Sequence, residues 1–170
     1  MKEKKIFLLI GQKGSGKSYI GSIMEAKFGI DFIHVEDWAK KVKKKRSMDD
    51  QGYLKQVFET IEDGIRARMN ISDTIVFEST GLTDYFDQMI SSLKKDFKLV
   101  TIGIQASPEI CLERVFLRDS TIHIEFSETQ VGFINDKVRE RNFKTDFIIT
   151  NQSKSESELI EELKSVLLSF

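Results

Sequence analysis

The fold is decided by Gly11-Gln12-Lys13-Gly14-Ser15-Gly16-Lys17-Ser18, a stretch that follows the apolar run Ile6–Ile10 and opens a helical pattern over residues 18–28. Its spacing, G-x-x-x-x-G-K-[ST], is typical of a phosphate-binding loop between a strand and a helix. Glycines let successive backbone N–H groups point inward around an anion, and the start of the helix adds a partial positive charge. The stretch therefore predicts an α/β fold that binds the phosphates of a nucleoside triphosphate.

Each residue type in this loop has a chemical role. Lys17 can reach the β- and γ-phosphates, and the Ser18 hydroxyl can bind magnesium. The backbone cradle is expected to consist of Gly11, Gly14, Ser15 and Gly16. We therefore expect ATP and Mg²⁺ as cofactors, although the loop does not distinguish ATP from GTP and does not identify the reaction.

Composition limits the class of protein. The 170 residues fit one domain, and a formal net charge of −1 gives no overall attraction to nucleic acid or membranes. The single cysteine, Cys111, excludes an intramolecular disulfide and a cysteine-based zinc cluster. No stretch approaches the roughly 20 apolar residues that span a bilayer. We expect one domain over residues 1–170, in the cytoplasm and without a membrane partner.

Five short apolar runs alternate with longer amphipathic segments. The runs are continuous and rich in β-branched and aromatic residues, as in strands covered on both faces. The expected strands are Ile6–Ile10, Phe32–Val35, Thr74–Phe77, Leu99–Ile104 and Phe147–Thr150. The expected helices cover residues 18–28, 49–69, 83–94, 108–118 and 156–168. This alternation predicts a parallel sheet with right-handed crossovers and helices on both faces.

Two stretches resemble a known family. Residues 6–30, with Phe-Leu-Leu-Ile before the loop, resemble the opening of shikimate kinase and its adenylate-kinase-like relatives. Asp146-Phe-Ile-Ile-Thr-Asn-Gln-Ser, followed by an acidic helix, is similar to the last strand and helix of these kinases. The resemblance implies a three-layer P-loop kinase fold with a five-stranded parallel sheet in the order 2-3-1-4-5. It also implies a substrate-binding helical segment at about 36–70 and a lid at about 119–130.

Acidic residues follow two of the expected strands, at the edge where a parallel sheet brings its carboxyl ends together. Glu36 and Asp37 follow the second strand, and Glu78 follows the third. A carboxylate here could bind magnesium or accept the proton of a substrate hydroxyl. Asp37 and Glu78 are therefore candidate catalytic and magnesium-binding residues, and Glu36 and Gly81 are candidate substrate-binding residues. The structural alternatives are acids favoured by a helix dipole, and a serine or threonine helix cap beside an incidental Glu78.

Arginines are expected around the same edge. Arg114 and Arg118 lie four residues apart and share one helical face. The resemblance implies that Arg118 stabilises the transferring phosphate, that Arg114 and Asn151 contact the nucleotide, and that Arg139 contacts the substrate. The alternatives are solvated ion pairs for the arginines and an ordinary loop residue for Asn151.

The leading hypothesis is a phosphotransferase that moves the γ-phosphate of ATP to a small-molecule or nucleotide acceptor. Shikimate kinases carry Asp-x-Asp after the second strand and a glycine run after the third, so the departures here leave the acceptor open. The basic run Lys40–Arg46 is consistent with an anionic acceptor or with a solvated helix face. Nucleic acid is disfavoured as a partner because no aromatic residues interleave with this run.

Two other functions remain as alternatives. The first is a nucleotide-dependent switch or ATPase module, although the Asn-Lys-x-Asp motif of switch GTPases is absent. The second is a polynucleotide 5′-end kinase or a toxin-type nucleotide-sugar kinase, in which Lys40–Arg46 would meet the acceptor. The sequence is compatible with a monomer and with a homodimer.

Overall fold

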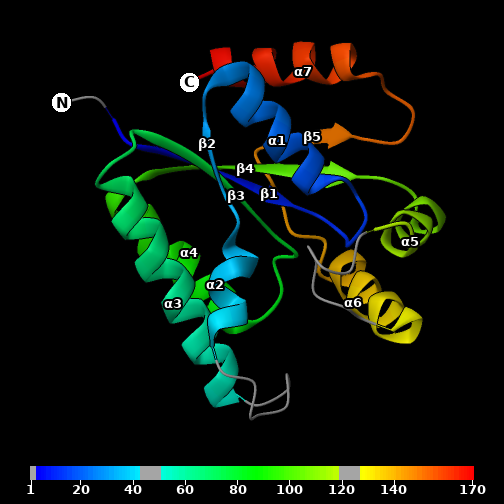
Figure 1. The fold of residues 1–170 in the computed structure, drawn as a ribbon, viewed down its shortest axis with the longest axis horizontal. Helices are drawn as coiled ribbons and strands as arrows, with labels where there is room; N and C mark the ends of the chain where they lie inside the picture. The colour runs from blue at the N-terminus through cyan, green and yellow to red at the C-terminus, as the bar shows by residue number, and fades with distance from the viewer. Residues whose placement is uncertain (1–2, 43–50, 119–126) are drawn as a thin grey trace.

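Five parallel strands form one sheet in the order β2-β3-β1-β4-β5, which confirms the expected topology (Figure 1). The structure is a computed structural model that describes residues 3–42, 51–118 and 127–170. The strands are β1 (Lys5–Ile10), β2 (Asp31–Ile33), β3 (Thr74–Ser79), β4 (Lys98–Gln105) and β5 (Phe147–Thr150). Each lies close to an apolar run of the sequence, because strands buried on both faces need continuous apolar residues.

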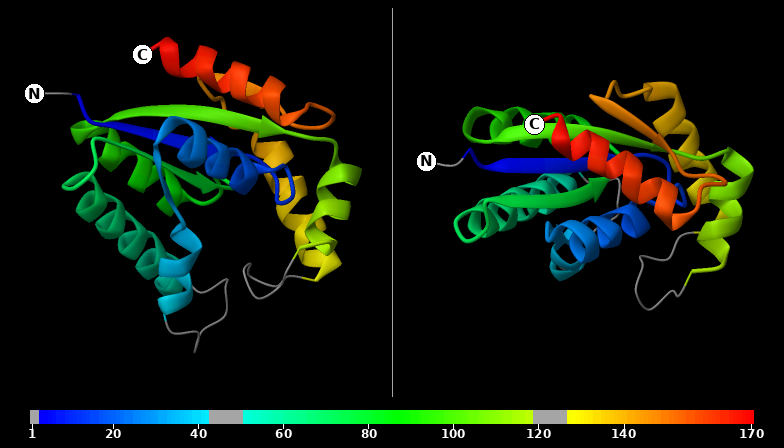
Figure 2. Two further views of the ribbon diagram at one scale, coloured as in Figure 1. Left: turned by 45° about the horizontal axis from the view of Figure 1, so that its top comes forward. Right: turned by 90° about the horizontal axis from the view of Figure 1, so that it is seen from above.

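Helices cover both faces of the sheet. They are α1 (Lys17–Phe28), α2 (Val35–Lys41), α3 (Gln51–Met69), α4 (Asp84–Asp96), α5 (Pro108–Phe116), α6 (Glu128–Arg141) and α7 (Glu156–Leu168). Helices α1 and α7 pack on one face, whereas α3 and α4 pack on the other (Figure 2). An apolar core fills the space between each pair of helices and the sheet. Along β1, Phe7 and Leu9 point into the core under α1 and α7, and Ile6 and Leu8 point into the core under α3 and α4, as the two-residue period of a strand requires. Within the described residues, no helix has the length and apolar character needed to cross a membrane.

Strands β1 and β3 end level with one another, and β4 continues past them to Gln105. In the parallel register, Ile10 of β1 lies opposite Ser79 of β3 and Gly103 of β4. The phosphate loop leaves β1 at this level, so the segment after β3 and the start of α5 come to lie beside it. The sheet therefore builds the site edge that a parallel topology predicts.

Helix α6 is not among the helices expected from the sequence. Val131 and Asn135 are its buried residues, so the stretch lacks the apolar stripe by which an amphipathic helix is recognised. The helix begins instead with a capping box, in which Ser127 and Gln130 satisfy each other's backbone N–H groups. Of the lid expected at about 119–130, residues 119–126 lie outside the described residues, and residues 128–130 form the first turn of α6.

Smaller differences occur at the ends of elements. Strand β2 ends at Ile33, so Val35, expected in the strand, begins α2. Helix α4 is capped by the hydroxyl of Thr83, which accepts a hydrogen bond from the Phe86 N–H, rather than by Ser79 or Thr80. Of the basic run over residues 40–46, Lys40 and Lys41 end α2, and residues 43–46 lie outside the described part of the chain.

The short helix α2 is held against α3 by an aromatic ring. Trp38 of α2 lies over Gly64 of α3, where an added Cβ would stand only 2.6 Å from Cζ3 of the ring. A larger residue at position 64 would push the indole away and shift α2. Because α2 carries Glu36 and Asp37, this close approach also positions two candidate site residues.

Replacing Gly64→Ala should therefore lower the free energy of unfolding by about 1–3 kcal/mol, the usual cost of overpacking. This loss outweighs the ~1 kcal/mol that alanine contributes in a helix relative to glycine. Urea titration followed by fluorescence of Trp38, the single tryptophan, measures the change. Gly132→Ala in α6 is the matched control, because its Cβ would meet nothing within 4 Å, and this change should stabilise the protein. A Gly64→Ala variant as stable as the control would contradict the packing.

Candidate functional site

The phosphate loop passes where side chains would not fit. Gly14 and Gly16 have φ angles of 83° and 97°, in the left-handed region that favours glycine. A Cβ on Gly14 would lie 2.0 Å from the Cys111 carbonyl oxygen of α5, and one on Gly16 would lie 1.9 Å from Nδ2 of Asn151. The loop thus packs closely between α5 and the end of β5. Glycine is needed at both positions for two reasons, the left-handed φ angle and the lack of space for a Cβ.

Two buried asparagines and an arginine fix the loop from outside. Asn135 of α6, which is 2% exposed, accepts a hydrogen bond from the Lys13 N–H at 2.7 Å and donates one to its carbonyl at 3.0 Å. The Asn151 amide donates to the Ser15 carbonyl at 3.1 Å, and Arg114 Nη1 donates to the same carbonyl at 3.3 Å. These bonds hold the loop in one conformation before any ligand arrives.

Two polar groups within the loop are suited to an anion. Lys17 is 7% exposed, and its ammonium donates to the carbonyls of Gly11 at 3.0 Å and Gln12 at 2.8 Å. Burial lowers the pKa of Lys17 to about 8, against the attraction of the Glu78 carboxylate. The Ser15 hydroxyl is fully buried and has no hydrogen-bond partner among the described residues. A buried ammonium and a buried unpaired hydroxyl are costly unless a ligand pairs with them.

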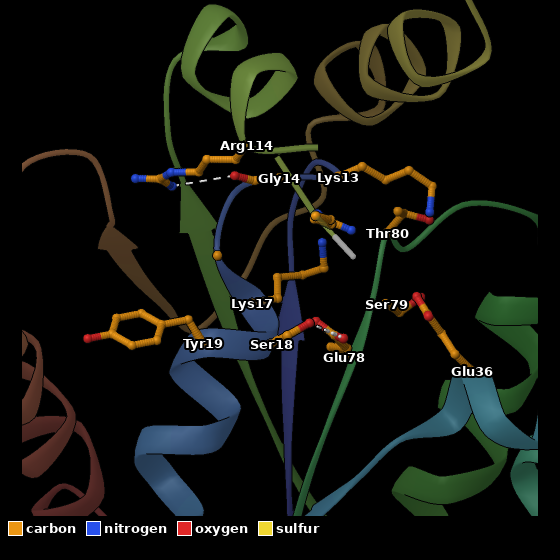
Figure 3. A pocket seen from close by; sticks show the side chains of 12 residues that line it. Lys13, Gly14, Lys17, Ser18, Tyr19, Glu36, Glu78, Ser79, Thr80 and Arg114 are labelled. Carbon is orange, nitrogen blue, oxygen red and sulfur yellow. Dashed lines mark hydrogen bonds between the residues drawn. The ribbon is translucent and has the colours of Figure 1, made fainter. Parts of the chain in front are cut away.

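Beside the loop, a hydroxyl and a carboxylate meet. Ser18 Oγ donates to Glu78 Oε1 at 2.6 Å (Figure 3). Oxygen ligands of this kind suit Mg²⁺, which usually takes one or two protein ligands and completes its shell with phosphates and waters. Accordingly, residues 3–42, 51–118 and 127–170 contain no group of three or more His, Cys, Asp or Glu that could hold a metal alone. Ser18 and Glu78 thus fit the magnesium that the fold family implies.

Most of the expected site residues converge on one cavity of about 260 Å³. Arg114 enters from α5, Glu36 from α2 and Glu78 from β3 (Figure 3). Arg118, which follows the end of α5 at Phe116, also lines the cavity. The other lining residues are Lys13, Gly14, Gly16, Lys17, Ser18, Tyr19, Ser79 and Thr80. The cavity is therefore bordered by the phosphate loop, by cationic side chains and by carboxylates.

A second cavity, of about 420 Å³, adjoins the first and contains Asp37. Ser18, Glu36 and Glu78 line both cavities, and His34 also lines the second one. Asp37 is exposed in the first turn of α2 and, unlike Glu36, does not line the cavity of the phosphate loop, so its metal and catalytic roles stay predictions.

The remaining predicted residues lie beside or beneath the loop. Arg139 donates to Oε1 of Gln12 at 2.7 Å and lines a separate cavity of about 540 Å³. Gly81 has a φ of 73°, and its N–H donates to Ser79 Oγ in the turn after β3. Asn151 holds the loop backbone through its hydrogen bond to the Ser15 carbonyl. The predicted substrate contacts of Arg139 and Gly81 and the nucleotide contact of Asn151 therefore stay predictions.

Sequence reasoning missed two residues that the structure brings to the site. Asn135 carries no recognisable signal because its helix, α6, was itself not expected. Lys13 occupies an undefined position of the loop motif, so the motif assigns it no role, yet its side chain lines the cavity.

The comparisons with known proteins agree with this geometry. No model of a protein family matches the chain. Shikimate kinase from Thermodesulfovibrio yellowstonii is 25% identical over 167 residues, which cover 94% of this chain and 92% of that protein. The structure of shikimate kinase from Acinetobacter baumannii in complex with shikimate has a TM-score of 0.64 at 13% identity, covering 98% of this chain and 94% of that one.

A second solved kinase has the same fold. The APS kinase from Mycobacterium tuberculosis in complex with AMPPNP and APS has a TM-score of 0.66 at 12% identity, and the match covers 98% of this chain and 99% of that one. The chain is a member of the P-loop kinase superfamily. At such low identities the solved structures establish the fold, and the acceptors of these relatives are properties of those proteins.

The Asn135 clamp makes a testable prediction for this P-loop kinase. Asn135→Ala leaves the Lys13 N–H and carbonyl without their buried partner, so the free energy of unfolding should fall by about 1–3 kcal/mol. Urea unfolding measures the change, with Asn70→Ala, at an exposed position after α3, as the control. Equal stabilities of the two variants would show that the amide does not hold the loop.

Proposed function

We propose that this P-loop kinase transfers the γ-phosphate of ATP to a small-molecule or nucleotide acceptor in a magnesium-dependent reaction. The observation that carries the proposal is the convergence of a buried phosphate loop, two arginines and two carboxylates on one cavity. A switch or a simple binding module needs the loop and the metal ligands, whereas phosphoryl transfer also needs the charges on the far wall of the cavity. Arg118 and Glu36 meet this second requirement.

Phosphoryl transfer depends mainly on positioning and on charge stabilisation. Lys17 would neutralise the β- and γ-phosphates, and Arg118 would stabilise charge on the transferring group, an effect worth about 10³–10⁵ in rate in comparable enzymes. Ser18 and Glu78 would hold Mg²⁺, which neutralises phosphate charge when bound. Because Glu78 already accepts the Ser18 hydroxyl, it fits the metal role better than the role of a base.

The acceptor would then approach from the side of α2. Glu36 borders both cavities, so its carboxylate can face a hydroxyl placed next to the terminal phosphate. As the acceptor oxygen forms its bond to the γ-phosphorus, the bond to the bridging β–γ oxygen breaks, ADP leaves, and the hydroxyl proton passes to a carboxylate. Glu36 is the first candidate for this carboxylate, and Asp37 is the second.

The compartment follows from the same chemistry. A kinase that uses ATP and keeps a free, buried thiol at Cys111 suits a reducing cytoplasm, and we propose this location. The acceptor is proposed to be small because the two joined cavities have volumes of about 260 and 420 Å³, which are in the range of small-molecule sites.

ATP turnover tests the proposal when it is measured with and without pools of small metabolites containing hydroxyl or phosphate groups. We expect one pool to stimulate turnover strongly and Lys17→Ala to abolish that stimulation, with AMPPNP affinity reduced about 10²-fold by loss of a charged phosphate contact. Lys27→Ala, at an exposed position on the same helix, is the control. Slow hydrolysis that no pool stimulates, with tight nucleotide retention, would instead favour a switch.

The lowered pKa of Lys17 predicts a pH dependence of nucleotide binding. In the free protein the ammonium loses its proton above pH about 8, whereas a bound phosphate favours the charged form. Affinity for AMPPNP should therefore fall as the pH rises above 8, approaching about tenfold per pH unit at the steepest. Calorimetric titrations between roughly pH 7 and 9.5 measure this slope.

Lys17→Arg provides the control for this pH effect, because a guanidinium stays charged throughout that range. Its affinity should be lower overall but nearly independent of pH. The same slope in wild type and Lys17→Arg would show that another group titrates.

A further inference from the structure

The phosphate loop contains a second lysine, Lys13. Its backbone is held by hydrogen bonds to Asn135, and these bonds do not involve its side chain. Asn135 holds the N–H and the carbonyl of Lys13, and any residue at this position could make these two backbone bonds. The clamp nevertheless determines where the side chain leaves the loop. A lysine at position 13 therefore calls for an explanation outside the packing of the loop.

The Lys13 side chain enters the cavity at the end where the carboxylates lie. It extends from the loop toward Thr80 beyond β3, whereas Arg114 lies on the other side of the loop, against Gly14 (Figure 3). Burial lowers the pKa of Lys13, and the attraction of Glu36 is the largest effect that opposes this shift. An ammonium in such a place is costly unless it meets negative charge.

The charges around the cavity suit a polyanion. Four cationic side chains line it, against two carboxylates, so the described lining carries a net charge of +2. The cations are Lys13, Lys17, Arg114 and Arg118, and the carboxylates are Glu36 and Glu78. Phosphates that lie along the loop would meet Arg114 at one end, Lys17 in the middle and Lys13 at the other end. The end at Lys13 is also the end where the carboxylates could serve magnesium and the acceptor.

We propose that Lys13, whose side chain lines the same cavity as Lys17 and Glu36, binds the terminal phosphate of the triphosphate. The inference rests on the proposed function, because it takes the loop to hold a nucleoside triphosphate. The bound phosphate would then compete with the Glu36 carboxylate for the attraction of the Lys13 ammonium. Weaker attraction by Lys13 would leave the Glu36 carboxylate more available to the acceptor hydroxyl, so occupancy of the donor site would prepare the acceptor site.

Binding of AMPPNP and of ADP, measured separately by calorimetry in the presence of Mg²⁺, tests the role of Lys13. Lys13→Met keeps the backbone bonds and the apolar stem but removes the charge. We expect it to weaken AMPPNP binding about tenfold or more and ADP binding less than twofold, because only the triphosphate has the third phosphate. Equal losses for both nucleotides, or no loss for either, would overturn the proposal.

Two controls separate this proposal from the proposed function. Lys27→Met, an exposed lysine on α1, should bind both nucleotides as wild type does. Lys17→Ala should weaken both nucleotides, and its failure to do so would overturn the proposed function itself. A Lys13→Met variant that weakens both nucleotides equally, with Lys17 still required, would overturn only the role of Lys13.

Glu36→Gln tests the competition between the carboxylate and the phosphate. The substitution removes the attraction of Glu36 for the Lys13 ammonium, so AMPPNP should bind about 3–10-fold more tightly while ADP binding changes little. In the Lys13→Met background the same substitution should give no such gain. Weaker AMPPNP binding by Glu36→Gln, or an equal gain in both backgrounds, would show that Glu36 does not act on Lys13. Trp38 fluorescence and thermal midpoints close to those of wild type confirm that each variant is folded.

Discussion

The close approach of the phosphate loop to α5 and β5 is the constraint on which the rest of the site depends. Gly14 and Gly16 have left-handed backbone angles at the positions where a side chain would strike the Cys111 carbonyl and the Asn151 amide. These close contacts with α5 and with the residue after β5 also fix the position of the loop at the end of the sheet. Because β1 and β3 end level, fixing the loop places Ser18 against Glu78 and directs Lys17 inward.

A loop held this firmly can keep charge buried without a ligand. Lys17 loses contact with solvent and donates to two carbonyl oxygens, and burial lowers its pKa despite the attraction of Glu78. The Ser15 hydroxyl, which is unpaired among the described residues, is a second cost of the same kind. Sites that are preorganised for an anion carry such costs, because groups already oriented toward the ligand need not reorganise when it binds. The stability lost in the loop is supplied by the two apolar cores on either side of the sheet.

The donor half of the site could be predicted from the sequence, because it is built from local signals. The loop motif, the apolar strands and the Ser107-Pro108 start of α5 are each local signals, and the residues they single out, Lys17, Glu78, Arg114 and Arg118, line one cavity. Helix α6 could not be predicted because caps and a buried asparagine hold it, and neither gives apolar periodicity. Without α6, neither Asn135 nor the direction of the Lys13 side chain follows from the sequence.

The acceptor half resists prediction for a related reason. Its side chains come from the first turn of α2, whose position depends on the contact between Trp38 and Gly64, two residues 26 positions apart that no local pattern connects. Glu36 lies where the two halves meet, since it borders the cavity of the phosphate loop and the cavity that contains Asp37. Lys13 attracts a carboxylate in this place, and in the proposed role of Lys13 a bound phosphate would weaken that attraction and leave Glu36 available to an acceptor. Such a coupling between donor and acceptor would need no large movement of the sheet, because it would act through the partners of one ammonium.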